Sequence, residues 1–114
     1  MKAINTSTQT TLAENILLAD KFVARLAGLL GRKTLPRGQG MLLKPCRSIH
    51  TFFMSFNIDA AFLNSEGEII YIVKELPPFR TTPVIIGARA VLELPAGTIS
   101  ETGTCIGDKI IFQG

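Results

Sequence analysis

Two apolar runs separated by a short polar turn constrain this chain more than any other feature. Ile58–Asn64 is an apolar run with little polar relief, and Glu68–Leu76 returns after the polar stretch Asn64–Gly67. A glycine at the end of such a stretch accepts the positive φ that a tight turn between antiparallel strands requires. The sequence therefore predicts a β-hairpin in the middle of the chain.

Other short apolar runs are bounded by Gly, Pro, Asn or Asp, which predicts further strands around the hairpin. These runs are Asn15–Ala19, Met41–Lys44, Ile49–Met54, Ala88–Leu94 and Lys109–Phe112. Pro77–Pro83 contains three prolines, which lack amide hydrogens, so it is expected to be an extended surface loop. Residues 1–11 are interpreted as a flexible lead or a short edge strand, and residues 12–114 as a single domain.

Helical periodicity is clear only over Lys21–Leu30, where apolar residues recur at spacings of three and four. Asp20 is a suitable N-cap for this helix, and Gly31 suits the left-handed residue at its end. Thr98–Gly103 predicts one or two further helical turns. Because strands outnumber helices, we expect an α+β domain built on a strongly bent, mostly antiparallel sheet or an open barrel.

Composition places the chain among compact globular proteins. Its 114 residues fit one domain, and 46% apolar with 18% charged residues argues against disorder. Charged residues interrupt every apolar run before it reaches the roughly 20 residues of a membrane span, and the amino terminus lacks the apolar core of a secretory signal. We therefore expect a cytoplasmic protein in which Cys46 and Cys105 both remain thiols.

The net charge of +3 is unevenly distributed, since seven basic residues and no acidic residue lie between Lys21 and Ile58. Two interpretations remain open. The basic residues form a positive face for an anionic ligand or an acidic partner, or they are ordinary solvated surface charges. The second is favoured because no more than two are adjacent, and the lack of interleaved aromatic residues argues against nucleic-acid binding.

The only histidine, His50, lies close in sequence to Cys46. His50 and Met54 would share one face of a strand, but four residues of strand separate them by about 13 Å, which argues against a soft-metal site. No metal and no cofactor are therefore expected. A thiol nucleophile would need His50 as its base, paired with Cys46 or Cys105, yet the sequence supplies no oxyanion hole and no orienting acid.

Two carboxylates, Asp59 and Glu93, interrupt otherwise apolar strands. Burying an ionised carboxylate costs several kcal/mol, roughly, unless it is paired or hydrogen-bonded. One interpretation is structural, with bonds to backbone amides or a salt bridge to Arg47 or Arg89. The other is functional, with His50, Asp59 and Glu93 around a cleft that holds a polar ligand.

Several short motifs occur in an order and spacing typical of one family. They are Arg25–Gly31, Gly40–Leu43, Thr51–Met54, Ile58–Leu63, Ala90–Gly97 and Gly107–Asp108. Over residues 12–112 the chain resembles the family catalogued as domain of unknown function 192. The resemblance implies a mixed, folded sheet forming an open pseudo-barrel with one main helix packed outside, and no established activity, cofactor or substrate. For relatives with a segment like Pro45–His50, it also implies a link to pilus assembly or secretion.

The leading hypothesis is a small binding or accessory module that presents a polar cleft to a small polar or anionic ligand or to a protein partner. The alternative is a small hydrolase or transferase that uses Cys46 with His50, or the carboxylates of Asp59 and Glu93. The candidate ligand-binding residues are Cys46, Arg47, His50, Met54, Asp59, Arg89 and Glu93.

Overall fold

A computed structural model describes residues 1–19, 34–52 and 54–114. No helix in these ranges is long and apolar enough to cross a membrane. Their secondary structure consists of β1 (Lys2–Asn5), β2 (Thr10–Ala13), β3 (Asn15–Ala19), β4 (Gln39–Leu43), β5 (Ile58–Leu63), β6 (Ile69–Leu76), β7 (Ala90–Pro95), the short helix α2 (Thr98–Glu101) and β8 (Ile110–Gln113).

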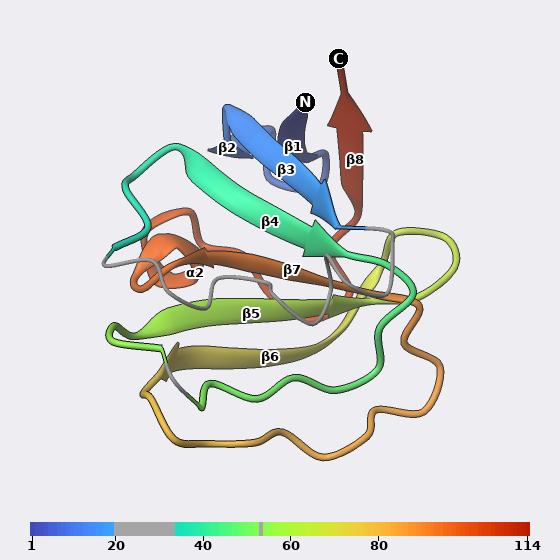
Figure 1. Ribbon diagram of the computed structural model, residues 1–114. Coiled ribbons are helices and arrows are strands. Elements are labelled where there is room, and N and C mark those ends of the chain that lie inside the picture. The colour runs from blue at the N-terminus through green and yellow to red at the C-terminus, as the bar shows by residue number, and fades with distance from the viewer. Residues whose placement is uncertain (20–33, 53) are drawn as a thin grey trace.

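The described strands form two sheets and no closed barrel (Figure 1). One sheet has the strand order β2-β1-β8 and the other the order β3-β4-β7-β5-β6. Strands β3 and β4 are parallel, whereas the other neighbours are antiparallel. The predicted mostly antiparallel sheet is thus confirmed, and the described residues are mostly strand with one short helix. The helix predicted over 21–30 lies outside the described residues, so its packing stays a prediction.

The predicted hairpin is present as β5 and β6. The Asn64 side-chain oxygen accepts hydrogen bonds from the backbone N–H groups of Glu66 and Glu68, which closes the turn. Gly67 has a φ of +80°, and a Cβ atom there would lie 2.6 Å from the carbonyl oxygen of Ile110. The turn therefore requires glycine both for its backbone conformation and for the close approach of β8.

The central strands of the five-stranded sheet are covered on both faces. Its first face packs against the three-stranded sheet, where Leu94 and Ala3 belong to one apolar cluster. Its second face packs against loop residues, where Phe62 lies in a second cluster with Ile49 and Met54. Every residue of β5 and of β7 is buried as a result, which explains why these strands lack the alternation of polar and apolar residues.

Two loops, 44–57 and 77–89, form the layer over this second face and run side by side (Figure 1). The backbone N–H of Thr51 donates to Arg80, and that of Thr82 donates to Ile49. A strand was predicted over Ile49–Met54, but among the residues of this range that the structure describes, 49–52 and 54, only His50 makes a β-bridge. The segment that runs beside it is the proline-rich loop. Its prolines lack amide hydrogens, which prevents a regular ladder of backbone hydrogen bonds.

The amino-terminal segment also differs from the sequence-based expectation. Residues 2–5 form the central strand of the three-stranded sheet, not a flexible lead or an edge strand. β1 pairs with β2 along one side and with β8, from the other end of the chain, along the other. This strand is short and carries polar residues, so its pairing with a distant segment leaves little signal in the local sequence.

Asn5 holds the two ends of the chain together. Its side chain is fully buried, and its oxygen accepts hydrogen bonds from the backbone N–H groups of Ser7 and Thr8. Its nitrogen donates to the hydroxyl of Thr104 at 3.2 Å and to the carboxylate of Asp108 at 2.9 Å. One amide therefore connects the turn after β1 with the turn before β8.

We predict that Asn5→Ala lowers the free energy of unfolding by about 2–3 kcal/mol, because it leaves buried polar groups without partners. Asn5→Asp retains the acceptor but places a second carboxylate beside Asp108. Its destabilisation should therefore be larger at pH 7 than at pH 4, where one carboxyl is protonated and can donate. Urea denaturation at both pH values measures this, and an equal loss at both would contradict the proposed contact.

Candidate functional site

The predicted site residues that precede β5 lie in the loop 44–57. Arg47 and His50 are exposed, and Cys46 is partly buried. Met54 is only 4% exposed and belongs to the second apolar cluster, below the loop surface. Met54 is therefore a core residue, and it cannot contact a ligand at the surface.

Asp59 and Glu93 lie on adjacent strands but on opposite faces of the sheet. In the pairing of β5 with β7, Asp59 is opposite Leu94, and Ala60 is opposite Glu93. Directly opposed residues point to the same face, whereas successive residues alternate. Asp59 therefore faces the three-stranded sheet, and Glu93 faces the loops. The prediction that both carboxylates and His50 share one cleft is wrong. The register pairs Asp59 with Leu94, one residue beyond Glu93, so the two carboxylates point to opposite faces.

The carboxylate of Asp59 has a structural role. Asp59 is fully buried, and its two oxygens accept hydrogen bonds from the backbone N–H groups of Glu75 and Ile99, each at 2.8 Å. Glu75 has a φ of +51°, which is rare for a residue with a side chain, and it lies where the pairing of β5 with β6 shifts register. The predicted bonds to backbone amides are thus observed, and they join β5, β6 and α2.

We predict that Asp59→Asn lowers the free energy of unfolding by about 2 kcal/mol, since an amide offers one acceptor oxygen where two buried N–H groups need acceptors. The helix α2 and the end of β6 should lose protection against amide hydrogen exchange before the remaining strands do. Uniform protection across the variant would show that this carboxylate does not hold these elements.

Glu93 lies in a different environment. It is 3% exposed, and its neighbours across the strands are Met41 and Ala60. Neither of the ion pairs found among the described residues includes it. Burial removes the carboxyl group from water and raises the pKa of Glu93 from 4.5 to about 7. Near neutral pH the side chain is thus partly protonated, and it lies beneath the loops where a surface ligand does not reach it.

Glu93 should make the protein less stable as the pH rises. Between about pH 4.5 and pH 7 the unfolded chain has released the Glu93 proton while the folded chain retains it, so the free energy of unfolding falls. We predict that Glu93→Gln matches the wild type below this range and is more stable above it by about 3 kcal/mol, the equivalent of the pKa difference. Thermal denaturation from pH 4 to pH 8 tests this, and parallel pH profiles would contradict it.

The two cysteines make local contacts. The Cys46 thiol donates to the carbonyl oxygen of Ser48 at 3.1 Å, and the His50 ring packs against Phe52 with a centroid distance of 5.4 Å. Neither of these two contacts joins the thiol to the imidazole, and such a contact is what a nucleophile and its base would need. Cys105 is exposed in the turn before β8, and no disulfide joins it to Cys46.

The structure also exposes residues that the sequence analysis did not select. Phe79 is 67% exposed and has a φ of +61°, and Val84 and Ile86 are 64% and 94% exposed. A signal was present in the sequence, because neither loop contains an acidic residue although both contain arginine and bulky apolar residues. We define the paired-loop surface as Arg47, His50, Phe52, Phe79, Arg80, Val84 and Ile86.

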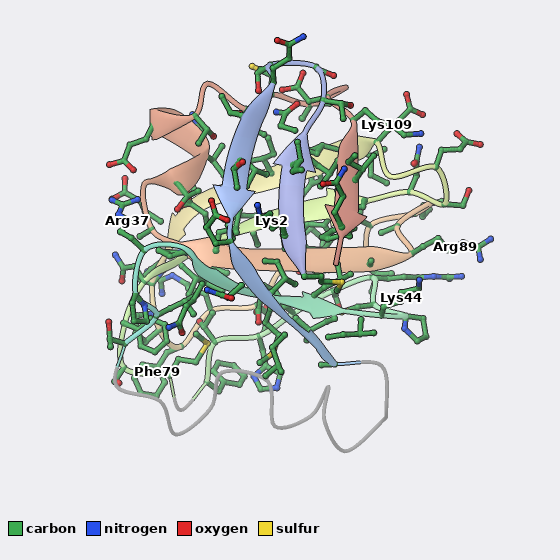
Figure 2. All side chains as sticks on the ribbon, turned by 90° about the horizontal axis from the view of Figure 1, so that it is seen from above. Lys2, Arg37, Lys44, Phe79, Arg89 and Lys109 are labelled. Atoms are coloured by element: carbon green, nitrogen blue, oxygen red, sulfur yellow. The ribbon has the colours of Figure 1, made fainter. Side chains whose placement is uncertain are left out.

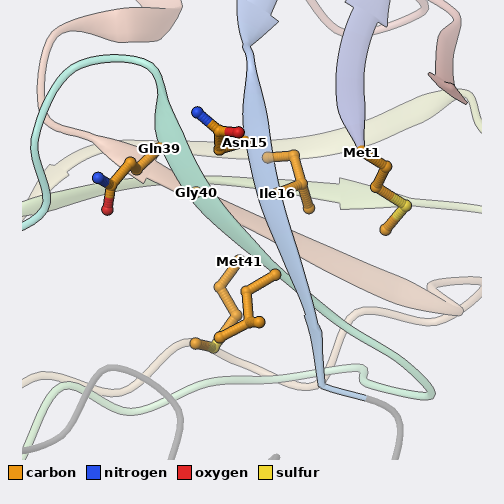
Figure 3. A pocket seen from close by; sticks show the side chains of 7 residues that line it. Met1, Asn15, Ile16, Gln39, Gly40 and Met41 are labelled. Carbon is orange, nitrogen blue, oxygen red and sulfur yellow. The ribbon is translucent and has the colours of Figure 1, made fainter. Parts of the chain in front are cut away.

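A pocket elsewhere in the fold contains none of the predicted site residues. It lies between the parallel strands β3 and β4 and the first residue of the chain (Figure 3). Its lining comes from Met1, from 15–17 and from 39–41. No charged side chain lines it.

Comparison with known proteins places the chain among uncharacterised relatives. It is 32% identical over 112 residues to UPF0127 protein PH1112 of the archaeon Pyrococcus horikoshii, covering 94% of this chain and 95% of that protein. It is also 32% identical over 100 residues to UPF0127 protein PF1050 of Pyrococcus furiosus, covering 83% and 84% of the two chains.

Two crystal structures from bacteria have the same fold. A protein of unknown function from Novosphingobium aromaticivorans superimposes with a TM-score of 0.84 at 21% identity, over 97% of this chain and 82% of that one. A protein from Sinorhizobium meliloti, described as a candidate transcription regulator, gives a TM-score of 0.83 at 25% identity, over 96% and 89%.

None of these descriptions mentions pilus assembly or secretion, so that link stays an expectation. The family DUF192, described as an uncharacterized ACR, matches residues 3–112. This match covers nearly the whole chain and includes all the motifs that carried the resemblance. The two archaeal relatives bear the name UPF0127, and the family match shows that the chain belongs to the DUF192 family.

Proposed function

We propose that this protein is a binding module whose paired-loop surface recognises an acidic protein segment with apolar side chains. The observation that carries this proposal is Phe79, whose large side chain is mostly exposed on a backbone held at a φ of +61°. Exposure and a left-handed backbone each cost free energy for such a residue, so neither is favoured by folding alone. A partner that buries the ring accounts for both.

The charge of the two loops supports an acidic partner. Arg47 and Arg80 are exposed, and the loops 44–57 and 77–89 contain no Asp or Glu. Neither arginine belongs to an ion pair among the described residues. Cations beside exposed apolar side chains complement a segment that contains both carboxylates and apolar residues, and they disfavour basic partners.

The loops hold this surface in a fixed shape. The hydroxyl of Thr51 donates to the carbonyl oxygen of Pro77 at 2.6 Å and accepts from the backbone N–H of Arg80 at 3.0 Å. The hydroxyl of Thr82 accepts from the backbone N–H of Ile49 at 3.0 Å. Because these bonds are made without a partner, binding loses little conformational entropy in the loops.

The enzymatic alternative has less support. A hydrolase or transferase would need Cys46 beside His50, or the two carboxylates on one side of the sheet. The hydrogen bond described for the Cys46 thiol goes to the carbonyl oxygen of Ser48, and Asp59 and Glu93 face opposite layers. Binding therefore remains the function that these residues favour.

Selection from a phage-displayed library of random peptides tests the proposal. The wild type should enrich peptides that combine Asp or Glu with aromatic or aliphatic residues. Phe79→Asn with Arg80→Ser should weaken binding of the selected peptides at least tenfold. Asn tolerates a left-handed backbone, so this variant should remain as stable as the wild type.

The matched control is Ile106→Ser with Lys109→Ser, which removes an exposed apolar residue and a cation from the turn before β8. This control should bind like the wild type. Failure to enrich any peptide, or equal weakening by both double variants, would overturn the proposal. Binding to phosphatidylglycerol vesicles without peptide enrichment would overturn it as well, since the surface would then recognise lipid.

A further inference from the structure

A second pocket lies at one end of the interface between the two sheets. Its volume is about 350 Å³, and it opens to solvent where the hairpin turn meets the beginning of β7 and the end of β4. The apolar residues that line it are contributed by four different strands. They are Leu42, Leu63, Ala90, Ile110 and Phe112.

This pocket is an extension of the core between the sheets. Leu42 and Ile110, one from each sheet, belong to the same apolar cluster as Leu63 and are at most 5% exposed. A gap at the end of such a core lets an apolar group reach side chains that are otherwise hidden from water. Its size lies near the lower limit of about 300–1,000 Å³ that is typical of small-molecule sites.

Two cationic side chains, those of Lys44 and Arg89, lie at the entrance of the pocket. Lys44 follows β4 and shares the face of Leu42 by strand alternation, and Arg89 immediately precedes β7. In Figure 2 both side chains leave the same end of the molecule. Both are exposed, and neither belongs to an ion pair with a described residue.

The other polar groups of the rim are neutral. They come from Asn64, Ser65 and Gly67 in the hairpin turn. Glu66, in the same turn, is exposed and is not among the residues that line the pocket. The described pocket thus combines an apolar floor with a positively charged rim and contains no carboxylate.

We infer that this pocket binds a small amphipathic carboxylate, with its apolar body on the floor and its carboxylate between Lys44 and Arg89. A guanidinium group holds a carboxylate through two parallel hydrogen bonds, and an ammonium group adds a second charge-assisted contact. A neutral ligand of the same shape gains only the apolar contact. This site shares no residue with the paired-loop surface, so the two proposals succeed or fail independently.

Titration of the isotopically labelled protein with octanoate, followed by amide NMR spectra, tests this inference. Octanoate should shift the amide signals of 42–44, 63–67, 89–90 and 110–112 in a saturable manner. Octanamide, which has the same chain without the charge, should bind at least tenfold more weakly. Lys44→Gln with Arg89→Gln should weaken octanoate binding at least tenfold and leave octanamide binding unchanged.

Arg47→Gln with Arg80→Gln is the matched control, because it removes two exposed arginines that lie outside the pocket. This control should bind octanoate like the wild type. Equal affinity for octanoate and octanamide would overturn the inference, as would equal weakening by the two double variants. Shifts confined to other regions, or no saturation at millimolar octanoate, would overturn it too.

Discussion

The burial of the central strands β5 and β7 on both faces of the five-stranded sheet is the constraint on which the rest of this structure depends. One face is covered by the three-stranded sheet and the other by the loops 44–57 and 77–89. Strands covered on both sides have no solvated face, so β5 and β7 are apolar except for one buried acid each, Asp59 and Glu93. The irregular loops are thereby structural parts of the fold. Their outer residues lie on a layer that hydrogen bonds between the two loops hold together.

Because both faces are buried, each polar group within the sheet must be accommodated separately. Asp59 accepts two backbone hydrogen bonds and thereby fixes the end of β6 and the helix α2. Glu93 faces the loop side, where burial raises its pKa to about 7. The two acids are equally conspicuous in the sequence, but one is held by hydrogen bonds as a structural carboxylate and the other is a partly protonated buried acid.

The outer residues of the fold provide its two candidate binding surfaces. The paired-loop surface combines exposed arginines with the strained, exposed Phe79, and the pocket at the sheet interface combines an apolar floor with Lys44 and Arg89. The cations of both surfaces belong to the loops 44–57 and 77–89, which contain no Asp or Glu. Of the basic residues between Lys21 and Ile58, Arg47 belongs to the paired-loop surface and Lys44 to the pocket. Four others lie outside the described residues: Lys21, Arg25, Arg32 and Lys33.

Local patterns in the sequence were sufficient to predict the hairpin of β5 and β6, the strand β3 and the short helix α2, because turn residues and apolar runs act over a few neighbouring residues. They also indicated that Asp59, if buried, needs a hydrogen-bonding or ion-pair partner. Only the tertiary structure placed β1 between β2 and β8, paired the loops in place of a strand at Ile49–Met54, and put Asp59 and Glu93 on opposite faces. These features depend on register and on contacts between distant segments, and a one-residue change of register reverses the direction of every side chain.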